Sequence, residues 1–141
     1  MAQLEIKVGT WDKLNSDAMA IRYEVFIVEQ SVPEDIERDD MDAVSMHAVA
    51  YSDDGQPIGT GRLLPDGHVG RMAVLRQARG TGIGGQILDA LLKKAQSLGH
   101  KHVALHAQVH ARGFYEAHGF QAEGDTFIEA GINHVLMVRH F

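Results

Sequence analysis

The stretch MAVLRQARGTGIGGQILDALLKKA, residues 72–95, constrains the fold of this chain more than any other. A short apolar run ends in a basic, glycine-dense turn, and an amphipathic segment follows. The apolar positions recur at helical spacing; they are Ile83, Ile87, Leu88, Leu91, Leu92, Ala95 and Leu98. Gly99 comes next and suits a helix end. The stretch therefore predicts a strand, a turn and a helix of an α/β protein.

The turn contains Gly80, Gly82 and Gly85, which spell the G-x-G-x-x-G pattern of dinucleotide-binding folds. Such a site needs the strand, the glycines and the helix in immediate succession, and an acidic residue about twenty positions further on. Here the residues RQAR separate the apolar run from the first glycine, and residues 105–109 contain no Asp or Glu. The match is therefore interpreted as coincidental. A P-loop fits even less well, because no Gly-Lys-Ser or Gly-Lys-Thr follows.

The same turn still has the properties of a phosphate site. Gly80, Gly82 and Gly84 remove side chains where backbone N–H groups open a helix, and the helix dipole is positive there. Arg76 and Arg79 add positive charge beside these groups. The alternative is that the glycines only permit close packing of the helix on a sheet. Alternating glycines behind two arginines favour the phosphate site.

Apolar periodicity along the first half of the chain predicts a strand, a helix and then three more strands. Residues 4–8 alternate like a strand, and Leu14, Ala18, Ile21, Val25 and Val28 lie on one face of a helix that starts at Trp11. Pro33 stops this helix, and residues 34–42 form an acidic loop or short helix. Residues 45–75 read as three strands joined by turns, an antiparallel meander.

The second half of the chain continues with a strand, a short helix and a final strand. Residues 102–109 place Val103, Leu105, Ala107 and Val109 on one face of a strand. The short helix ends at Gly119, and the last strand starts at Ile132. If the segment between Phe120 and Ile132 adds a strand, the element order is β-α-(α)-β-β-β-α-β-α-β-β. We expect one domain over residues 1–141 with a mixed α/β fold.

Composition excludes several classes of function. The chain has no cysteine, so disulfides, thiolate metal sites and cysteine nucleophiles are absent, and a cytoplasmic location is expected. The formal net charge of −6 argues against nucleic acid as a partner. No apolar run is long enough to span a membrane, and residues 1–11 have no secretory-signal pattern. Nine histidines occur without an H-E-x-x-H motif, so no metal site is expected.

Several motifs in order resemble those of one family. Arg79, Gly82 and Gly84 match the defined positions of [Q/R]-x-x-G-x-[G/A] between a strand and a helix, and LHAQVHARGFYEAHGF follows with Phe114 and Tyr115. The chain thereby resembles the GNAT-superfamily N-acetyltransferases. The segments IRYEVFIVEQSVPEDIERDD and EAGINHVLMV resemble its ElaA-like subgroup. The resemblance implies the acyl-CoA N-acyltransferase fold, in which helices flank a mixed, largely antiparallel central sheet.

The resemblance implies acetyl-CoA as co-substrate and direct transfer of its acetyl group to a primary amine, without a metal. The pyrophosphate would lie on the N–H groups of residues 79–84, and the pantetheine arm along residues 72–74. The Val74 N–H would bind the developing oxyanion, and Tyr115 would be the acid for the leaving thiolate. Gln108 stands where many members carry Asn. The implied cofactor-binding residues are Met72, Ala73, Val74, Arg79, Gly80, Thr81, Gly82, Ile83, Gly84, Gln108, Phe114 and Tyr115.

The group that takes the proton from the amine stays open among Glu29, His47, His134 and water. Glu29 belongs to the E-Q pair of the subgroup, but it serves as a base only if burial raises its pKa; otherwise it is a solvent-facing helix end. His47 and His134 lie on predicted strands, where either could relay a proton or be a hydrogen-bonded core residue. All three are candidates for binding the acceptor. Tyr115 could likewise simply pack its ring.

The acceptor is expected to be a cationic small-molecule amine or a lysine-bearing peptide. The acidic segment Glu34, Asp35, Glu37, Asp39, Asp40 and Asp42 would border its cleft and attract positive charge. No nucleic-acid or membrane partner is expected, and a homodimer through the last strand is conceivable without any feature that requires it. The alternative function is a non-catalytic module that binds acyl-CoA as a sensor or regulatory subunit.

Overall fold

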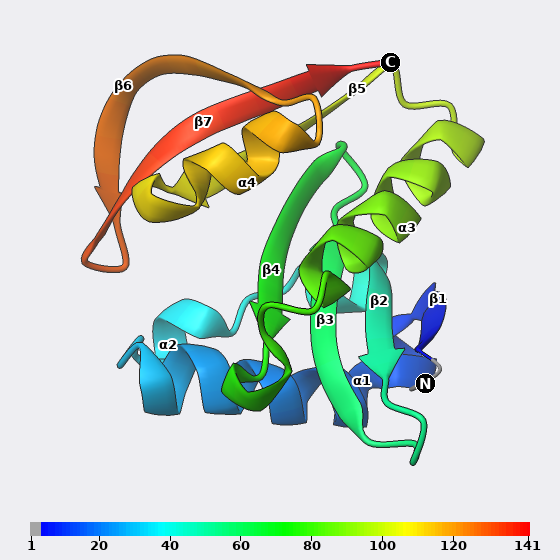
Figure 1. Cartoon of the computed structure of the whole chain (residues 1–141). Helices are drawn as coiled ribbons and strands as arrows, with labels where there is room; N and C mark the ends of the chain where they lie inside the picture. The colour runs from blue at the N-terminus through cyan, green and yellow to red at the C-terminus, as the bar shows by residue number, and fades with distance from the viewer. Residues whose placement is uncertain (1–3) are drawn as a thin grey trace.

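The computed structural model describes residues 4–141, so residues 1–3 of the expected domain lie outside it. Seven strands form one sheet in the order β1-β2-β3-β4-β5-β7-β6 (Figure 1). The strands are β1 Glu5–Thr10, β2 Met46–Tyr51, β3 Pro57–Leu63, β4 His68–Val74, β5 His102–Gln108, β6 Gln121–Glu129 and β7 Ile132–His140. Every neighbouring pair is antiparallel except β4 and β5. The predicted fold class, element order and antiparallel first half are confirmed.

The helices lie between these strands. They are α1 Trp11–Arg22, which continues as the π-helix η1 Tyr23–Glu29, then α2 Glu34–Glu37, α3 Ile83–Ser97 and α4 Arg112–Ala117. Single 3-10 turns are η2 Asp42–Val44, η3 Arg76–Ala78 and η4 Val109–Ala111. The predicted strand between Phe120 and Ile132 exists as β6.

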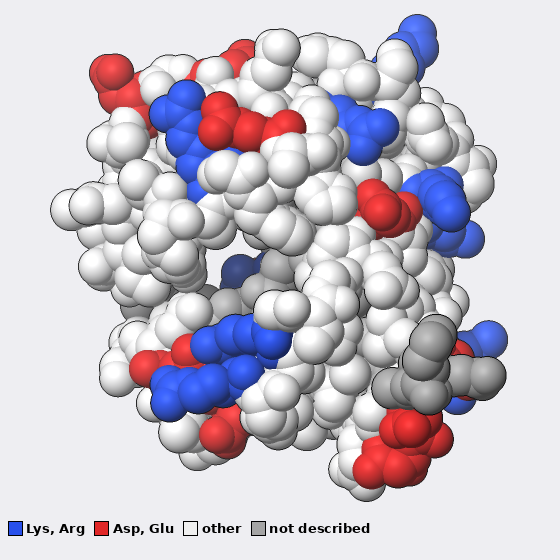
Figure 2. Space-filling model, viewed as in Figure 1, with Lys and Arg blue, Asp and Glu red and all other residues white. Residues whose placement is uncertain are grey.

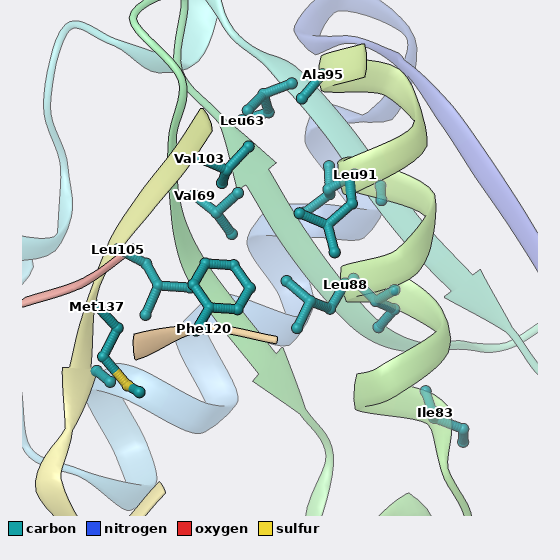
Figure 3. Packing of buried hydrophobic residues seen from close by; sticks show 14 of the residues in the cluster. Leu63, Val69, Ile83, Leu88, Leu91, Ala95, Val103, Leu105, Phe120 and Met137 are labelled. Carbon is teal, nitrogen blue, oxygen red and sulfur yellow. The ribbon is translucent and has the colours of Figure 1, made fainter. Parts of the chain in front are cut away.

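Helices α1 and α3 cover opposite faces of the sheet. Ala48 and Ala50 of β2 are buried under α3, whereas Val49 between them is buried under α1, as the alternation of a strand requires. The core under α3 is the larger one, and Figure 3 shows Leu88 and Leu91 of α3 directed at the residues of the sheet. Gly61 of β3 allows this approach, because a Cβ there would lie 2.8 Å from Leu91 Cδ1.

Three apolar residues expected on buried faces are exposed instead. Val28 is 54% exposed because the chain has entered the π-helix, whose wider turn rotates it off the face that α1 buries. Leu98 is 55% exposed because α3 ends at Ser97, and Gly99 then takes a φ of 88°. Val109 is 40% exposed because β5 ends at Gln108 and a 3-10 turn begins. The other predicted members of these faces are buried.

Strands β4 and β5 pair only at their beginnings. The register holds for His68 with Ala104 and for Val69 with Leu105, and no later pair forms among the described residues. Arg71 has a φ of 51°, and the register between β3 and β4 shifts at the same place, between Thr60 and Arg62. This irregularity bends β4 away from β5 (Figure 1). The two strands therefore open into a wedge in the middle of the sheet.

Candidate active site

The wedge between β4 and β5 forms a cleft of about 700 Å³. Its walls come from β4, β5, the end of η1, Tyr115 of α4 and the turn between β6 and β7. Figure 2 shows the molecule hollowed between the half that carries β5 to β7 and the half that carries α1 and α2, with Lys or Arg side chains along one rim. A cleft at a break in a sheet exposes backbone N–H and C=O groups that a paired strand would use.

The glycine-rich turn lies beside this cleft and leaves several backbone N–H groups free. Gly80 and Gly82 have φ values of 79° and 83°, which side chains strongly disfavour. Gly82 is the N-cap of α3 and provides no side-chain cap, and the first N–H to reach a helical carbonyl is that of Gln86, which donates to Gly82 O. Between Gly80 and Gly85 the described backbone offers no acceptor for the N–H groups. This arrangement can hold a phosphate group.

Arg79 is held at the base of this turn by two different groups. Its Nε donates to Val74 O at 2.9 Å, and its two terminal nitrogens donate to the two carboxylate oxygens of Glu29, each at 2.7 Å. The Arg79 guanidinium holds the pKa of the Glu29 carboxyl below its usual range. The condition for Glu29 as a base, a pKa raised by burial, is therefore not met in this arrangement.

Glu29 and its neighbour Gln30 together bridge the two sides of the cleft. Glu29 reaches Arg79 after β4, and Gln30 Oε1 accepts a hydrogen bond from Gln108 Nε2 at the end of β5, at 3.2 Å. Both residues end a π-helix, in which the Gln30 N–H donates to Val25 O five residues back. The sequence predicted functional roles for Glu29 and Gln108 but not this bridge, because a π-helix has no clear pattern in the sequence.

Tyr115 lines the cleft from α4. Its ring packs edge-on against Phe114 and Phe120, with ring centres 5.0 and 6.0 Å away. Within residues 4–141 the Tyr115 hydroxyl has no hydrogen-bond partner, and burial raises the pKa of Tyr115 to about 12. Phe114 lies against Gly84, since a Cβ at that glycine would be 3.6 Å from Phe114 Cζ. The helix α4 thus contacts the glycine turn through Phe114 and lines the cleft through Tyr115.

The two candidate histidines lie in different places. His47 is 1% exposed, donates through Nε2 to Asp42 O at 2.9 Å and packs at a tilt against Trp11, so it is a core residue outside the cleft. Burial lowers the pKa of His47. His134 lines the cleft, and its Nδ1 lies 2.7 Å from Ile132 O. Because a carbonyl only accepts, Nδ1 carries the proton of the neutral ring and Nε2 keeps its lone pair.

Glu129 is a cleft residue that sequence reasoning missed. Its Oε2 lies 3.7 Å from His134 Nε2, and its Oε1 lies 3.0 Å from His106 Nδ1. Glu129 ends β6 and His134 is near the start of β7, so the tight turn between these strands brings the two together. The E-A-G-I-N-H string contained this pairing, but only the register of the hairpin shows that both side chains face the same cleft.

Half of the acidic segment, namely Glu37, Asp39 and Asp42, is paired with arginines. Arg22, which is 1% exposed, pairs with Glu37 and with Asp42, and Arg62 pairs with Asp39 and Asp42. Arg71 also approaches Asp39, at 3.2 Å. These ion pairs fasten residues 37–42 to the sheet as one wall of the cleft. The sequence shows the acids in one run but not their partners, which come from three separate elements.

Two further properties concern metals and membranes. Across residues 4–141, no group of three or more His, Asp and Glu side chains is arranged to hold a metal ion. None of the helices described has the length and apolarity needed to cross a membrane.

Comparison with known proteins places the chain in a family. The model of the acetyltransferase (GNAT) domain matches residues 11–141. The uncharacterised N-acetyltransferase YjcF of Bacillus subtilis is 39% identical over 127 residues, which cover 87% of this chain and 90% of the relative. An acyl-CoA N-acyltransferase from Pseudomonas aeruginosa has a similar structure, with a TM-score of 0.86 and 32% identity over 97% of this chain and 99% of the other.

Escherichia coli ElaA also has a similar structure, with a TM-score of 0.86 and 25% identity over 96% of this chain and 99% of the other. The matched region includes the glycine turn, the cleft and both segments that resemble the ElaA-like subgroup. The chain therefore belongs to the GNAT superfamily, as an N-acetyltransferase whose structure is similar to that of ElaA.

Proposed function

We propose that the chain transfers the acetyl group of acetyl-CoA directly to a primary amine of a cationic acceptor, in the cytoplasm. The observation that carries this proposal is a cleft with Tyr115, His134 and Arg79 in its walls, beside which the glycine turn leaves backbone N–H groups free. The family uses acetyl-CoA, and its members act on amines. The chemistry that acetyl-CoA supplies is a thioester, whose carbonyl carbon an amine can attack.

On the cofactor side, the free N–H groups of Gly80 to Gly84 would bind the diphosphate, and Arg79 would add a charge-assisted contact. The splayed edge of β4 at residues 72–74 would pair with the pantetheine amides through its backbone. The remaining residues proposed for this side are Thr81, Ile83, Gln108 and Phe114. The absence of side chains at the glycines fits a group that must approach the backbone closely.

On the acceptor side, we assign the base to His134. An ammonium has no lone pair for attack, so a group in the cleft must take its proton. His134 Nε2 can accept this proton because Nδ1 is committed to Ile132 O, and the Glu129 carboxylate 3.7 Å away would stabilise the imidazolium. Glu29 and His47 fit this role less well, since Glu29 is paired with Arg79 and His47 lies outside the cleft.

Two further groups would act on the charges that develop during transfer. The Val74 N–H, at the end of β4, would donate to the oxygen of the attacked carbonyl. The Tyr115 hydroxyl would donate to the leaving sulfur. A pKa of about 12 keeps this hydroxyl protonated at every physiological pH, so the donor is always present. As the C–S bond breaks, the sulfur would take the electron pair together with the proton from Tyr115, and the proton that the new amide nitrogen must lose would restore the Tyr115 hydroxyl.

The preference for a cationic acceptor rests on residues outside the neutralised network. Glu34, Asp35 and Asp40 are exposed around the wall formed by residues 37–42, and the chain has a net charge of −6. A negative rim raises the local concentration of cations, and salt screens this effect. The acceptor KM should therefore rise with ionic strength. A KM that stays constant would remove the argument for a cationic acceptor.

The test is a thiol-release assay of the purified chain with acetyl-CoA against polyamines, small monoamines and lysine-bearing peptides. We expect acceptor-dependent release of CoA and a mass increase of one acetyl group on the acceptor. Binding of CoA without turnover on any amine would instead support the alternative function, a sensor or regulatory module. A chain that binds no CoA at all would overturn both.

A further inference from the structure

The ion pair between Glu29 and Arg79 joins the two halves of the cleft. Glu29 ends η1, on the side of the acidic wall, and Arg79 begins the glycine turn, 50 positions later. Both side chains line the cleft, and their exposures are 22% and 39%. Arg76 lies 3.8 Å from the same carboxylate. One carboxylate thus faces both arginines that the turn provides for an anion.

We propose that Glu29 exchanges partners during binding: it holds Arg79 while the cofactor cleft is empty, and it binds the ammonium of the acceptor once a diphosphate occupies the glycine turn. This inference rests on the proposed function. It makes Glu29 a residue that couples the two substrates.

The charges support the first half of the exchange. A diphosphate at the free N–H groups of Gly80 to Gly84 lies next to Arg79 and therefore next to the Glu29 carboxylate. Like charges at this range repel, and a partly exposed ion pair is a weak competitor for a doubly charged anion at a helix N-terminus. The diphosphate therefore takes over the terminal nitrogens of Arg79. The Nε bond to Val74 O keeps the guanidinium at the turn while its partner changes.

The geometry of η1 supports the second half. Gln30 is tied to Gln108 at the end of β5, so the end of η1 stays at the cleft when the Glu29 side chain is released. The carboxylate then keeps only the exposed Arg76, 3.8 Å away, and it lines the same cleft as His134 and Glu129. An acceptor ammonium is a suitable replacement, because it restores the charge balance that the diphosphate disturbed.

The two steps of the partner exchange predict opposite effects of one substitution on cofactor binding and acceptor binding. Glu29→Gln removes the charge that competes with the diphosphate but keeps a side chain of the same size. Calorimetric titration should show CoA, and separately inorganic pyrophosphate, binding about 3- to 10-fold more tightly, as expected for the loss of one like charge near an exposed site. The KM for the acceptor should rise by about 10-fold or more, because one charge-assisted contact is lost. A merely structural role would weaken both ligands together.

Glu24→Gln is the matched control, since Glu24 is exposed on the same π-helix and does not line the cleft. It should change neither the CoA affinity nor the acceptor KM. If the wild-type chain binds no CoA, the proposed function fails. If the wild type binds CoA and Glu29→Gln binds it no more tightly, or leaves the acceptor KM unchanged, the partner exchange is wrong and the proposed function stands. A thermal melt of each variant identifies any loss of folding.

Discussion

Glu129 Oε2 lies 3.7 Å from His134 Nε2, across the turn that joins the last two strands. The Nδ1 of the same ring is committed to Ile132 O, so its lone pair and the carboxylate face each other. In the proposed mechanism, the proton that Nε2 takes from the amine would face this carboxylate. Because both side chains line the cleft, the pair is placed where the proposed proton removal from an amine would occur.

His134→Gln should lower kcat/KM by about 100-fold or more at neutral pH, the range for loss of a general base. The deficit should shrink as the pH rises, because more of the acceptor amine is then already neutral. Steady-state kinetics across the pH range check both points. His140→Gln is the control, since His140 lies exposed on the same strand and outside the cleft. A His134→Gln deficit that stays constant with pH would assign His134 to binding rather than proton transfer.

Glu129→Gln should have a smaller effect, about 10-fold on kcat, because the carboxylate acts through the imidazole rather than on the substrate. A glutamine has the same shape but no charge to stabilise the imidazolium. The readout is kcat together with the acceptor KM. We expect kcat to fall while the KM for acetyl-CoA stays the same; a change confined to the KM values would contradict this role.

Tyr115→Phe removes only the hydroxyl, and the ring contacts with Phe114 and Phe120 remain. Thiol release should fall by about 100-fold, as for loss of a general acid, while CoA affinity barely changes. Since the pKa of Tyr115 is raised to about 12, the wild-type rate should show no loss from tyrosine ionisation up to pH ~10. Kinetics and calorimetry on both proteins test this. Residual activity equal to that of the wild type would remove Tyr115 from the mechanism.

The sequence predicted the elements well because each has a strong local period. The stripe of α3 and the alternation of β2 and β5 are set by burial on one face, and the glycines that end elements have positive φ values where expected. The glycine turn could be identified for the same reason: its free N–H groups are a property of consecutive residues. Val28 is an exception because the α-helix has become a π-helix there, and this change produces no pattern of apolar residues in the sequence.

The shape of the site could not be predicted, because it depends on contacts between distant residues. The wedge follows from the φ of 51° at Arg71, a residue that shows no sign of it in the sequence. Arg22 ends α1, and it is buried between Glu37 and Asp42. Whether a carboxylate is free or paired decides its chemistry, and pairing across the sheet becomes visible only in three dimensions.

The packing of α3 on β3 leads to a prediction about stability. A Cβ at Gly61 would lie 2.6 Å from Met72 Sδ and 2.8 Å from Leu91 Cδ1. Gly61→Ala should therefore lower the free energy of unfolding by about 1–3 kcal/mol, the range for overpacking a core. Gly70→Ala, on the neighbouring strand, is the control because nothing lies within 4 Å of the added carbon. Denaturant titrations compare the free energies of unfolding of the two variants. Equal values would mean that α3 moves to accommodate the added carbon without loss of stability.

The buried His47 predicts how stability depends on pH. Burial lowers the pKa of His47 from its ordinary value of 6.5, so the unfolded chain takes up the proton first and stability is lost as pH falls below 6.5. His47→Gln should be less stable at pH 7.5, because the contact with Trp11 is lost. From pH 7.5 to 5.5, however, the wild type should lose about 1 kcal/mol more than the variant, since each bound proton is linked to at most about 1.4 kcal/mol per pH unit.

The pH range from 7.5 to 5.5 isolates this effect. This range lies above about pH 4, where Asp and Glu titrate. Of the nine histidines, the eight other than His47 are common to both proteins. Denaturant unfolding at the two pH values gives the difference directly. Parallel losses in the two proteins would show that the native state accepts the proton on His47 as readily as the unfolded chain does. The Nε2–H bond to Asp42 O and the ring contact with Trp11 argue for the opposite result, because both hold the ring in a site that excludes water.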